Sequence, residues 1–362
     1  MCRTARPSLP LGESAELLAE KYGISRERRD EFALRSHRKA AQAQAAAHFD
    51  VEFAPVTVPQ PKCGAVAFAA DESVRPHDGP SRGGMVSMHH LLHHHLVGAA
   101  DAPPLILGPS LGTSKAVWEP PLPSLTRRFR VLRFDLPGHG GSPTAVLRDP
   151  APGRTTLEDL ASLVLDLADH HGWDSFHYAG ISLGGAIGTH LAAFHPERVA
   201  SLTAVCSSAH FGAAEPWLRR AELVRDEGTA PLLVSMPDRW FAAAASASTP
   251  FGRRLLGDLA AADPAGYAAC CDALAALDLR PALARISAPT LVVGGSDDAA
   301  TPLEHAEELA EGIPRAGLEV IGCGHLAIEQ PEALRAALTA HLSACLLRGG
   351  TRISGADQAV GP

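Results

Sequence analysis

The sequence predicts an α/β protein built on a mostly parallel sheet, and three observations support that prediction. From about residue 88 onward, short β-branched or leucine-rich runs alternate with amphipathic helical segments. One run leads directly into the glycine-rich turn Gly180–Gly184 and a following helix, and later a long helical insertion interrupts the alternation. Because single cores usually stop growing at roughly 250–300 residues, the chain of 362 residues also predicts a second, smaller part.

Composition and charge restrict the function classes. Hydrophobic residues make up 46% of the chain and charged residues 20%, as in globular proteins, and no apolar run is long enough to cross a bilayer. The net charge of −8 and the lack of a basic stripe argue against a nucleic-acid surface. Residues 1–10 lack the apolar core of a secretory signal, so we expect a cytoplasmic protein that acts on a small molecule.

We expect residues 1–58 to form a small helical extension at the N-terminal end of the α/β domain. The pattern favours one helix over Glu16–Tyr22 and a second helix that begins after Ser25, followed by a short β-like run at Val51–Val58. Residues 59–87 are rich in proline, glycine and aspartate without a sustained period, which indicates a linker.

Residues 88–344 carry the α/β pattern, and residues 345–362 are expected to form a C-terminal tail. The insertion at about residues 209–285 is rich in tryptophan, arginine and alanine and is too long for a connecting loop, so we expect a helical cap there. The expected strands are Leu105–Leu107, Val131–Asp135, Phe176–Ala179, Leu202–Cys206, Thr290–Val293 and Leu318–Ile321.

The helix expected over residues 156–171 illustrates the helical pattern. Thr155 and Glu158 have the spacing of a capping box, and Gly172 ends the segment. Leucines and a valine recur on one face of this helix, which predicts that the face is buried.

The turn Gly180-Ile181-Ser182-Leu183-Gly184 is the strongest chemical signal in the sequence. It lies between a predicted strand and a helix over residues 185–194, which is the context of a nucleophile elbow. In such an elbow, glycines permit a strained turn that lifts the serine hydroxyl above the sheet. A bare G-x-S-x-G can also be a plain tight turn, but the strand and the helix on either side favour Ser182 as a nucleophile.

A serine nucleophile needs a base to take its proton, and the base needs a carboxylate to orient it. His325 follows the last predicted strand in a glycine-containing loop, and Asp298 follows the preceding strand, so the chain order Ser, Asp, His is satisfied. The neighbouring Asp297 is the alternative acid. We favour Asp298 and predict that it forms a catalytic triad with Ser182 and His325.

Two backbone amides must stabilise the oxyanion of a tetrahedral intermediate. The elbow supplies the amide of Leu183, the residue after the nucleophile. The loop after the first core strand, Gly108–Thr113, offers the amide of Leu111. A glycine turn without a catalytic duty is the alternative interpretation of this loop.

Five residues of the predicted cap are candidates to line a pocket for a small anion, although each of them taken singly is more often a packing or surface residue. Among them we favour Arg239 as the cation that binds this anion, because the neighbouring Trp240 provides an aromatic wall that excludes water and strengthens an ion pair. The five candidates are Trp217, Arg219, Arg220, Arg239 and Trp240.

Two histidine-containing segments carry weaker signals. Asp135–Gly140 follows a predicted strand, and a Gly- and Pro-rich corner of this kind more often shapes the edge of a sheet than forms a second site. The five histidines between His89 and His95 alternate with leucines, as in a half-exposed strand, and no third-ligand pattern supports a metal. We therefore expect neither a metal nor an organic cofactor.

Residues 88–344 resemble the 3-oxoadipate enol-lactonases, which are members of the α/β-hydrolase superfamily. The resemblance implies an α/β-hydrolase fold with a helical cap, a triad at Ser182, Asp298 and His325, and hydrolysis of an enol-lactone to 3-oxoadipate in the β-ketoadipate pathway of aromatic degradation. Beyond the elbow, the similar segments are Ser110-Leu111-Gly112-Thr113, Val131-Leu132-Arg133-Phe134-Asp135, Arg239-Trp240-Phe241, Pro264-Ala265-Gly266-Tyr267-Ala268-Ala269 and Asp298-Ala299-Ala300-Thr301-Pro302.

Residues 11–60, and more loosely the residues up to about 80, resemble a middle segment of the thiolases. The similar segments are Gly12–Glu16, Tyr22–Arg26 and Phe32–His37. Neither the nucleophilic cysteine segment nor the C-terminal His and Cys segments of a thiolase are present, so we expect no thiolysis.

Two other functions are consistent with these residues. The same triad would support another carboxylesterase of this fold, or a cofactor-free perhydrolase. The alternative of a different class is an inactive hydrolase domain whose N-terminal helices serve as an assembly module. The presence of the serine, the aspartate and the histidine argues against inactivity.

Overall fold

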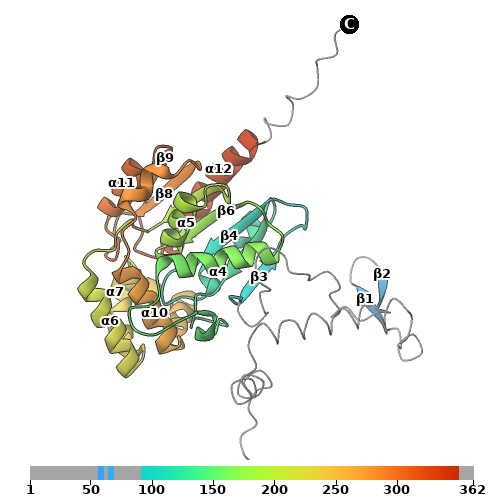
Figure 1. The fold of residues 1–362 in the computed structure, drawn as a ribbon. Coiled ribbons are helices and arrows are strands. Elements are labelled where there is room, and N and C mark those ends of the chain that lie inside the picture. Colours follow the sequence, from blue (N-terminus) through green and yellow to red (C-terminus); the bar gives the residue numbers. More distant parts are fainter. Residues whose placement is uncertain (1–55, 61–63, 69–90, 350–362) are drawn as a thin grey trace, which may run out of the picture. The chain divides into compact units, whose positions relative to one another are not determined.

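The computed structural model describes residues 56–60, 64–68 and 91–349 (Figure 1). The chain divides into two compact units, Met1–Met85 and Val86–Pro362. The two helices expected over Glu16–Tyr22 and after Ser25 lie outside the described residues.

The described residues of the first unit form a hairpin. Strand β1 (Val56–Gln60) pairs antiparallel with β2 (Gly64–Phe68), and Val58 lies opposite Val66. The linker expected at residues 59–87 therefore contains a strand. A run of five mostly small residues is too short to show a recognisable period, which is why the sequence did not reveal it.

The second unit contains a seven-stranded sheet with the order β3-β5-β4-β6-β7-β8-β9. Strand β3 runs antiparallel to β5, and all other neighbouring strands are parallel, which confirms the predicted fold class. The strands are β3 (His94–Val97), β4 (Pro104–Gly108), β5 (Arg130–Phe134), β6 (Phe176–Ile181), β7 (Val199–Val205), β8 (Thr290–Gly295) and β9 (Ala316–Ile321).

Helices flank this sheet, and α4 and α5 lie next to each other across one of its faces (Figure 1). The last helix extends to Gly349, so the tail expected from residue 345 begins later. The flanking elements are η2 (Lys115–Trp118), α3 (Leu122–Leu125), η3 (Thr144–Val146), α4 (Leu157–His170), α5 (Leu183–Phe194), α11 (Leu303–Gly312), η6 (Ala327–Glu329) and α12 (Pro331–Gly349).

The capping box of α4 lies one residue later than expected. The side chain of Thr156 accepts a hydrogen bond from the Asp159 amide, and the Asp159 carboxylate accepts one from the Thr156 amide. Thr155, the expected cap, is buried and donates its hydroxyl to the Asp149 carbonyl at 3.3 Å. Both threonines have an acidic residue three positions later, so only burial distinguishes them.

The insertion between β7 and β8 is helical, and its helices lie together below the sheet in the view of Figure 1. Helices α6 and α10 pack against each other. The elements of the insertion are α6 (Ala214–Glu227), η4 (Ala230–Val234), α7 (Met236–Trp240), α8 (Ala244–Ala247), α9 (Pro250–Ala260), α10 (Pro264–Ala275) and η5 (Arg280–Arg285).

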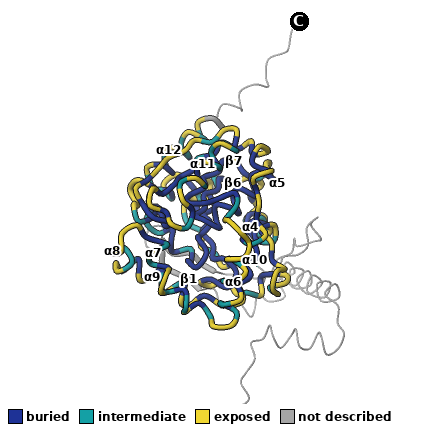
Figure 2. The backbone as a smooth tube through the Cα atoms, turned by 90° about the vertical axis from the view of Figure 1, so that its left-hand side faces the viewer, coloured by how far each residue is buried: buried dark blue, intermediate teal, exposed yellow. Residues whose placement is uncertain are grey.

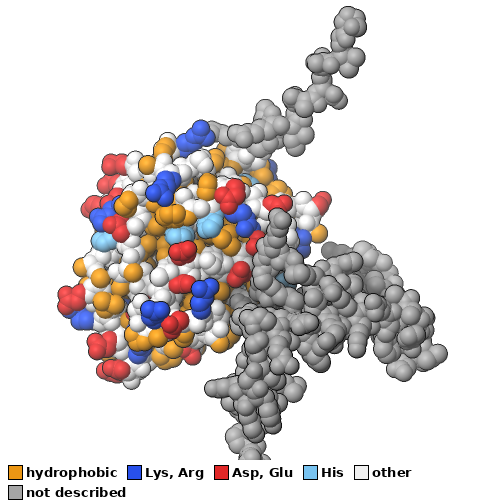
Figure 3. Space-filling model, viewed as in Figure 1, with side chains coloured by type: hydrophobic (Ala, Val, Ile, Leu, Met, Phe, Trp, Pro, Cys, Tyr) orange, Lys and Arg blue, Asp and Glu red, His pale blue; other side chains and the backbone are white. Residues whose placement is uncertain are grey.

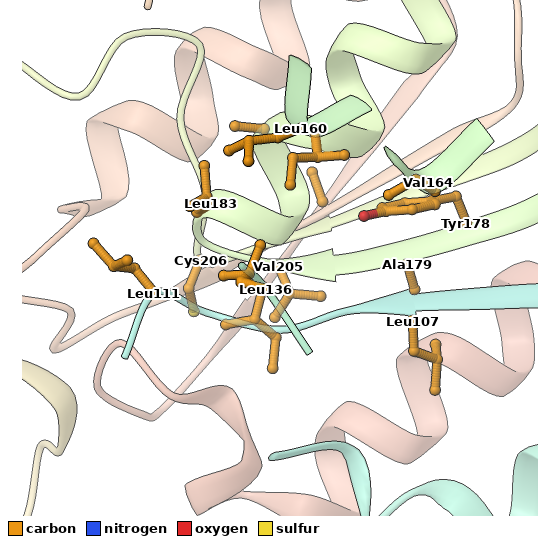
Figure 4. Packing of buried hydrophobic residues seen from close by; sticks show 14 of the residues in the cluster. Leu107, Leu111, Leu136, Leu160, Val164, Tyr178, Ala179, Leu183, Val205 and Cys206 are labelled. Carbon is orange, nitrogen blue, oxygen red and sulfur yellow. The ribbon is translucent and has the colours of Figure 1, made fainter. Parts of the chain in front are cut away.

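The core of the second unit lies along the central strands. Every residue of β6 is buried, as is typical of a parallel strand covered on both faces. Buried residues follow the strands in Figure 2, and Figure 4 shows residues from β4, β6, β7 and α4 packed in one cluster. On the face drawn in Figure 3, acidic and basic side chains are interspersed. Within the described part of the chain, no helix is both long and apolar enough to cross a bilayer.

Candidate active site

Ser182 lies at the turn between β6 and α5 and has a φ of 55°. This left-handed conformation is strained for a residue other than glycine. The glycines around it are required by space: a Cβ at Gly180 would lie 2.2 Å from the carbonyl carbon of Gly184, and a Cβ at Gly184 would lie 2.4 Å from the oxygen of Gly108. The turn therefore has the tight strand-to-helix geometry of a nucleophile elbow.

His325 and Asp298 come from the loops after β9 and β8 and contact each other. The Nδ1 atom of His325 is 3.0 Å from Oδ2 and 3.1 Å from Oδ1 of Asp298, and both side chains are buried. If Nδ1 donates its proton to this carboxylate, Nε2 is left with a lone pair. This is the tautomer that a general base for a serine needs.

The carboxylate of Asp298 is held by three further donors. It accepts hydrogen bonds from the amides of Ala300 and Thr301 at 2.8 and 2.9 Å, and from the Thr301 hydroxyl at 2.7 Å. Burial opposes its ionisation, but a charge on His325, its hydrogen bond and the Thr301 donors hold the pKa of Asp298 below its usual range. Thr301 thus holds the Asp298 carboxylate with two hydrogen bonds, a contact that the sequence alone did not reveal.

The alternative acid lies in a different environment. Asp297 is exposed, and its carboxylate accepts a hydrogen bond from the hydroxyl of Ser296 at 2.7 Å. Of the two aspartates, it is Asp298 whose carboxylate contacts His325. The geometry therefore favours Asp298 as the orienting acid.

Ser182 and His325 line one pocket, together with Leu111, Arg239 and Trp240 from the sequence analysis. Leu183, the residue after the serine, is fully buried and does not line this pocket, so only its amide is relevant to the predicted role. The pocket is lined by Ser110, Leu111, Ser182, Phe211, Trp217, Arg220, Met236, Arg239, Trp240, Tyr267, Leu274, Ala300, Thr301 and His325.

The amides next to the two predicted oxyanion donors are engaged elsewhere. After Leu111, the Gly112 amide donates to Nε2 of His139 at 3.0 Å. After Leu183, the Gly184 amide donates to the Pro109 carbonyl at 3.1 Å, which joins the two loops. These bonds fix the backbone on which the amides of Leu111 and Leu183 lie.

His139 therefore does more than shape a corner, which is all that the sequence analysis expected. Its Nδ1 lies 2.9 Å from the Pro137 carbonyl, so Nδ1 carries the proton and Nε2 can accept from Gly112. Burial lowers the pKa of His139, which keeps the ring neutral. The ring also stacks on Tyr267 of the pocket wall, with centroids 5.8 Å apart.

Two arginines line the pocket without a carboxylate partner among the described residues, namely Arg220 and Arg239. Burial and the charge of Arg220 lower the pKa of Arg239. The guanidinium of Arg220 lies over the ring of Trp217, 4.7 Å from its centroid. The other candidate, Arg219, is exposed and pairs with Glu215, so it does not belong to the pocket.

Comparison with known proteins agrees with this fold. The sequence profile of the alpha/beta hydrolase fold family matches residues 103–229 and 254–331. The chain belongs to this family. Residues 3–78 match the N-terminal domain of thiolases, in agreement with the resemblance found in that segment.

Three proteins illustrate what the chain is similar to within the α/β-hydrolase family. It is 36% identical over 251 residues to 3-oxoadipate enol-lactonase 2 from Acinetobacter baylyi, a match that covers 69% of this chain and 92% of that protein. The pimeloyl-acyl-carrier-protein methyl ester esterase from Vibrio campbellii is 33% identical over 221 residues, covering 59% and 83%. The crystal structure of an enol-lactonase from Burkholderia xenovorans has a TM-score of 0.65 at 32% identity, covering 70% of this chain and 96% of that chain.

Proposed function

We propose that this α/β-hydrolase hydrolyses 3-oxoadipate enol-lactone to 3-oxoadipate, a step of the β-ketoadipate pathway of aromatic degradation. The observation that carries the proposal is that one pocket contains Ser182, His325 and two arginines without carboxylate partners among the described residues. An enol-lactone with a free carboxylate has a group for each part of that pocket: its lactone carbonyl suits Ser182 and His325, and its carboxylate suits the arginines. The identity to an enol-lactonase supports this choice of substrate.

In the first step of the proposed mechanism, Oγ of Ser182 attacks the lactone carbonyl carbon and Nε2 of His325 takes the hydroxyl proton. Asp298 stabilises the imidazolium that forms, and the amides of Leu111 and Leu183 donate to the oxyanion. The ring C–O bond then breaks and the imidazolium of His325 gives its proton to the departing enolate, which leaves an acyl group on Ser182 and a neutral His325. The enolate is a good leaving group because it is resonance-stabilised and becomes a ketone after protonation.

In the second step, water attacks the acyl carbon and His325 takes its proton. The bond to Ser182 breaks, the serine regains its proton from His325, and a carboxylate is released. These steps use only side chains and amides of this chain together with water.

The substrate carboxylate would lie against Arg239. A buried carboxylate without a partner costs several kcal/mol, so a cation in the pocket is required for an anionic lactone. Arg239 lies beside the buried Trp240, which excludes water on one side. Arg220 lines the same pocket and is the second candidate for this role.

The test is the loss of enol-lactone absorbance with purified protein, measured beside a neutral aryl ester and a methyl ester. We expect the highest kcat/KM for the enol-lactone. A higher kcat/KM for one of the esters would assign the pocket to an esterase instead. If a fluorophosphonate does not label Ser182 and no substrate is turned over, the remaining interpretation is an inactive hydrolase domain that serves as an assembly module.

A further inference from the structure

Glu329 is a carboxylate outside the triad that contacts the helical insertion. It ends η6, four residues after His325. Its oxygens accept hydrogen bonds from the amides of Ala242 and Ala243 at 3.0 and 3.1 Å, and from the hydroxyl of Ser246 at 2.5 Å. These three donors belong to the segment directly after Trp240, a residue of the pocket wall.

The same carboxylate contacts the loop that carries the histidine. The amide of Gly324 donates to Oε2 of Glu329 at 3.1 Å. Gly324 is also packed tightly against the insertion, because a Cβ there would lie 2.5 Å from the Ala242 nitrogen. On the other side of His325, the Leu326 amide donates to the Trp240 carbonyl at 3.0 Å. The histidine is thus held between two attachments to the insertion.

Four donors match the acceptor capacity of an ionised carboxylate, which has two oxygens with two lone pairs each. Burial opposes ionisation of Glu329, but the hydrogen bonds from Ser246, Ala242, Gly324 and Ala243 hold its pKa below the usual range. The carboxylate is therefore charged at neutral pH. A glutamine has the same shape but keeps only one acceptor oxygen and would turn its NH2 group toward donors.

We propose that Glu329 is a positioning residue that fixes the His325 loop to the insertion. It would hold the proposed base and the pocket wall with Arg239 and Trp240 in one relative geometry. Without it, only the hydrogen bond from the Leu326 amide to the Trp240 carbonyl and the packing of Gly324 would join the two segments, and small misplacements of a base are costly for the rate. The inference rests on the proposed role of His325 and not on the identity of the lactone.

The test compares Glu329→Gln with Glu332→Gln. Glu332 lies three residues later, is largely exposed and pairs with Arg335, so it is a matched control for the loss of one acidic charge. Active sites are first titrated with a fluorophosphonate. The kcat per titrated site is then measured on a neutral aryl ester, and KM is measured on the anionic enol-lactone.

We expect Glu329→Gln to lower kcat per titrated site on the aryl ester about tenfold and to raise KM for the lactone by several-fold. The titratable fraction stays at the wild-type value. The ratio to wild type is constant between roughly pH 6 and pH 9, because a carboxylate with a lowered pKa does not titrate there. Glu332→Gln is expected to match wild type in every measurement.

An unchanged kcat per titrated site, or a loss confined to the titratable fraction, would reduce Glu329 to a structural role and overturn the proposal. If Glu329→Gln does not fold, Ser246→Ala tests the proposal instead, because it removes only one of the four hydrogen bonds to Glu329. A twofold to threefold slower rate per site supports the proposal, and a wild-type rate rejects it. Turnover of the aryl ester without turnover of the lactone would reject the proposed substrate alone.

Discussion

Two regions of the pocket differ in whether their charged groups have partners within the protein. One is the carboxyl edge of the sheet, which carries Asp298 and His325, and the other is the cap wall, which the helical insertion forms with Arg220, Arg239 and Trp240. At the sheet edge, the Asp298 carboxylate accepts hydrogen bonds from four donors, including Nδ1 of His325. At the cap wall, Arg220 and Arg239 line the same pocket, and neither forms an ion pair with a carboxylate among the described residues.

In the proposed mechanism, this difference separates catalysis, at the edge of the sheet, from substrate binding, at the pocket wall. The groups at the sheet edge are oriented before any substrate arrives, as electrostatic preorganisation requires. The arginines of the wall are partly buried cations, and burial of a cation without a partner is unfavourable. An anionic ligand would remove that cost, so we expect the two regions to respond differently to mutation.

The largest effect is expected at the nucleophile. Ser182→Ala removes the only group that can form the acyl intermediate in the proposed mechanism, and we expect kcat to fall by ~10⁶-fold. The substitution deletes one small polar atom, so thermal unfolding is expected to change little. Turnover measured beside a melting curve tests both statements. Activity within tenfold of wild type would remove Ser182 from the proposed mechanism.

The orienting acid comes next. Asp298→Asn keeps the shape of the side chain but donates toward His325 and favours the wrong tautomer, so we expect kcat to fall by about 10⁴-fold. The matched control is Asp297→Asn, at an exposed position whose carboxylate contacts Ser296. Its kcat is expected to stay within about twofold of wild type. The opposite ranking in steady-state assays would move the acid to Asp297.

A smaller and selective effect is expected at the pocket wall. Arg239→Ala removes a charge-assisted hydrogen bond of about 1.5–3 kcal/mol, which corresponds to a rise in KM of roughly 10- to 150-fold for the anionic lactone. KM for a neutral aryl ester is expected to change little. Arg219→Ala is the control, because that arginine is exposed and pairs with Glu215. Equal effects of Arg239→Ala on both substrates would reject Arg239 as the residue that binds the substrate carboxylate, and Arg220 would then be tested.

The smallest effect is expected from removal of the first unit. A protein that begins at Met85 keeps every residue of the sheet edge and of the pocket wall, since these all lie beyond Gly108. We expect kcat/KM for the lactone within about twofold of the full chain. An insoluble or inactive product would mean that residues 1–84 contribute to the hydrolase unit.

The sequence alone was sufficient to predict the α/β class, six of the strands and the residues of the proposed triad. Local patterns encode these features: apolar runs mark β6 and β8, and glycines mark the turn around Ser182, where a Cβ would collide with the backbone. The capping box of α4 was misplaced by one residue because two threonines satisfy the same spacing.

Only the tertiary structure decided which side chains support the site. His139 binds Gly112 across 27 positions of sequence, and Glu329 binds Ala242 across 87. Burial and contacts of the side chains likewise decided between Asp298 and Asp297, and between Arg219 and the two arginines that line the pocket. No local period records such contacts, because they form only when loops from separate strands meet at the same edge of the sheet.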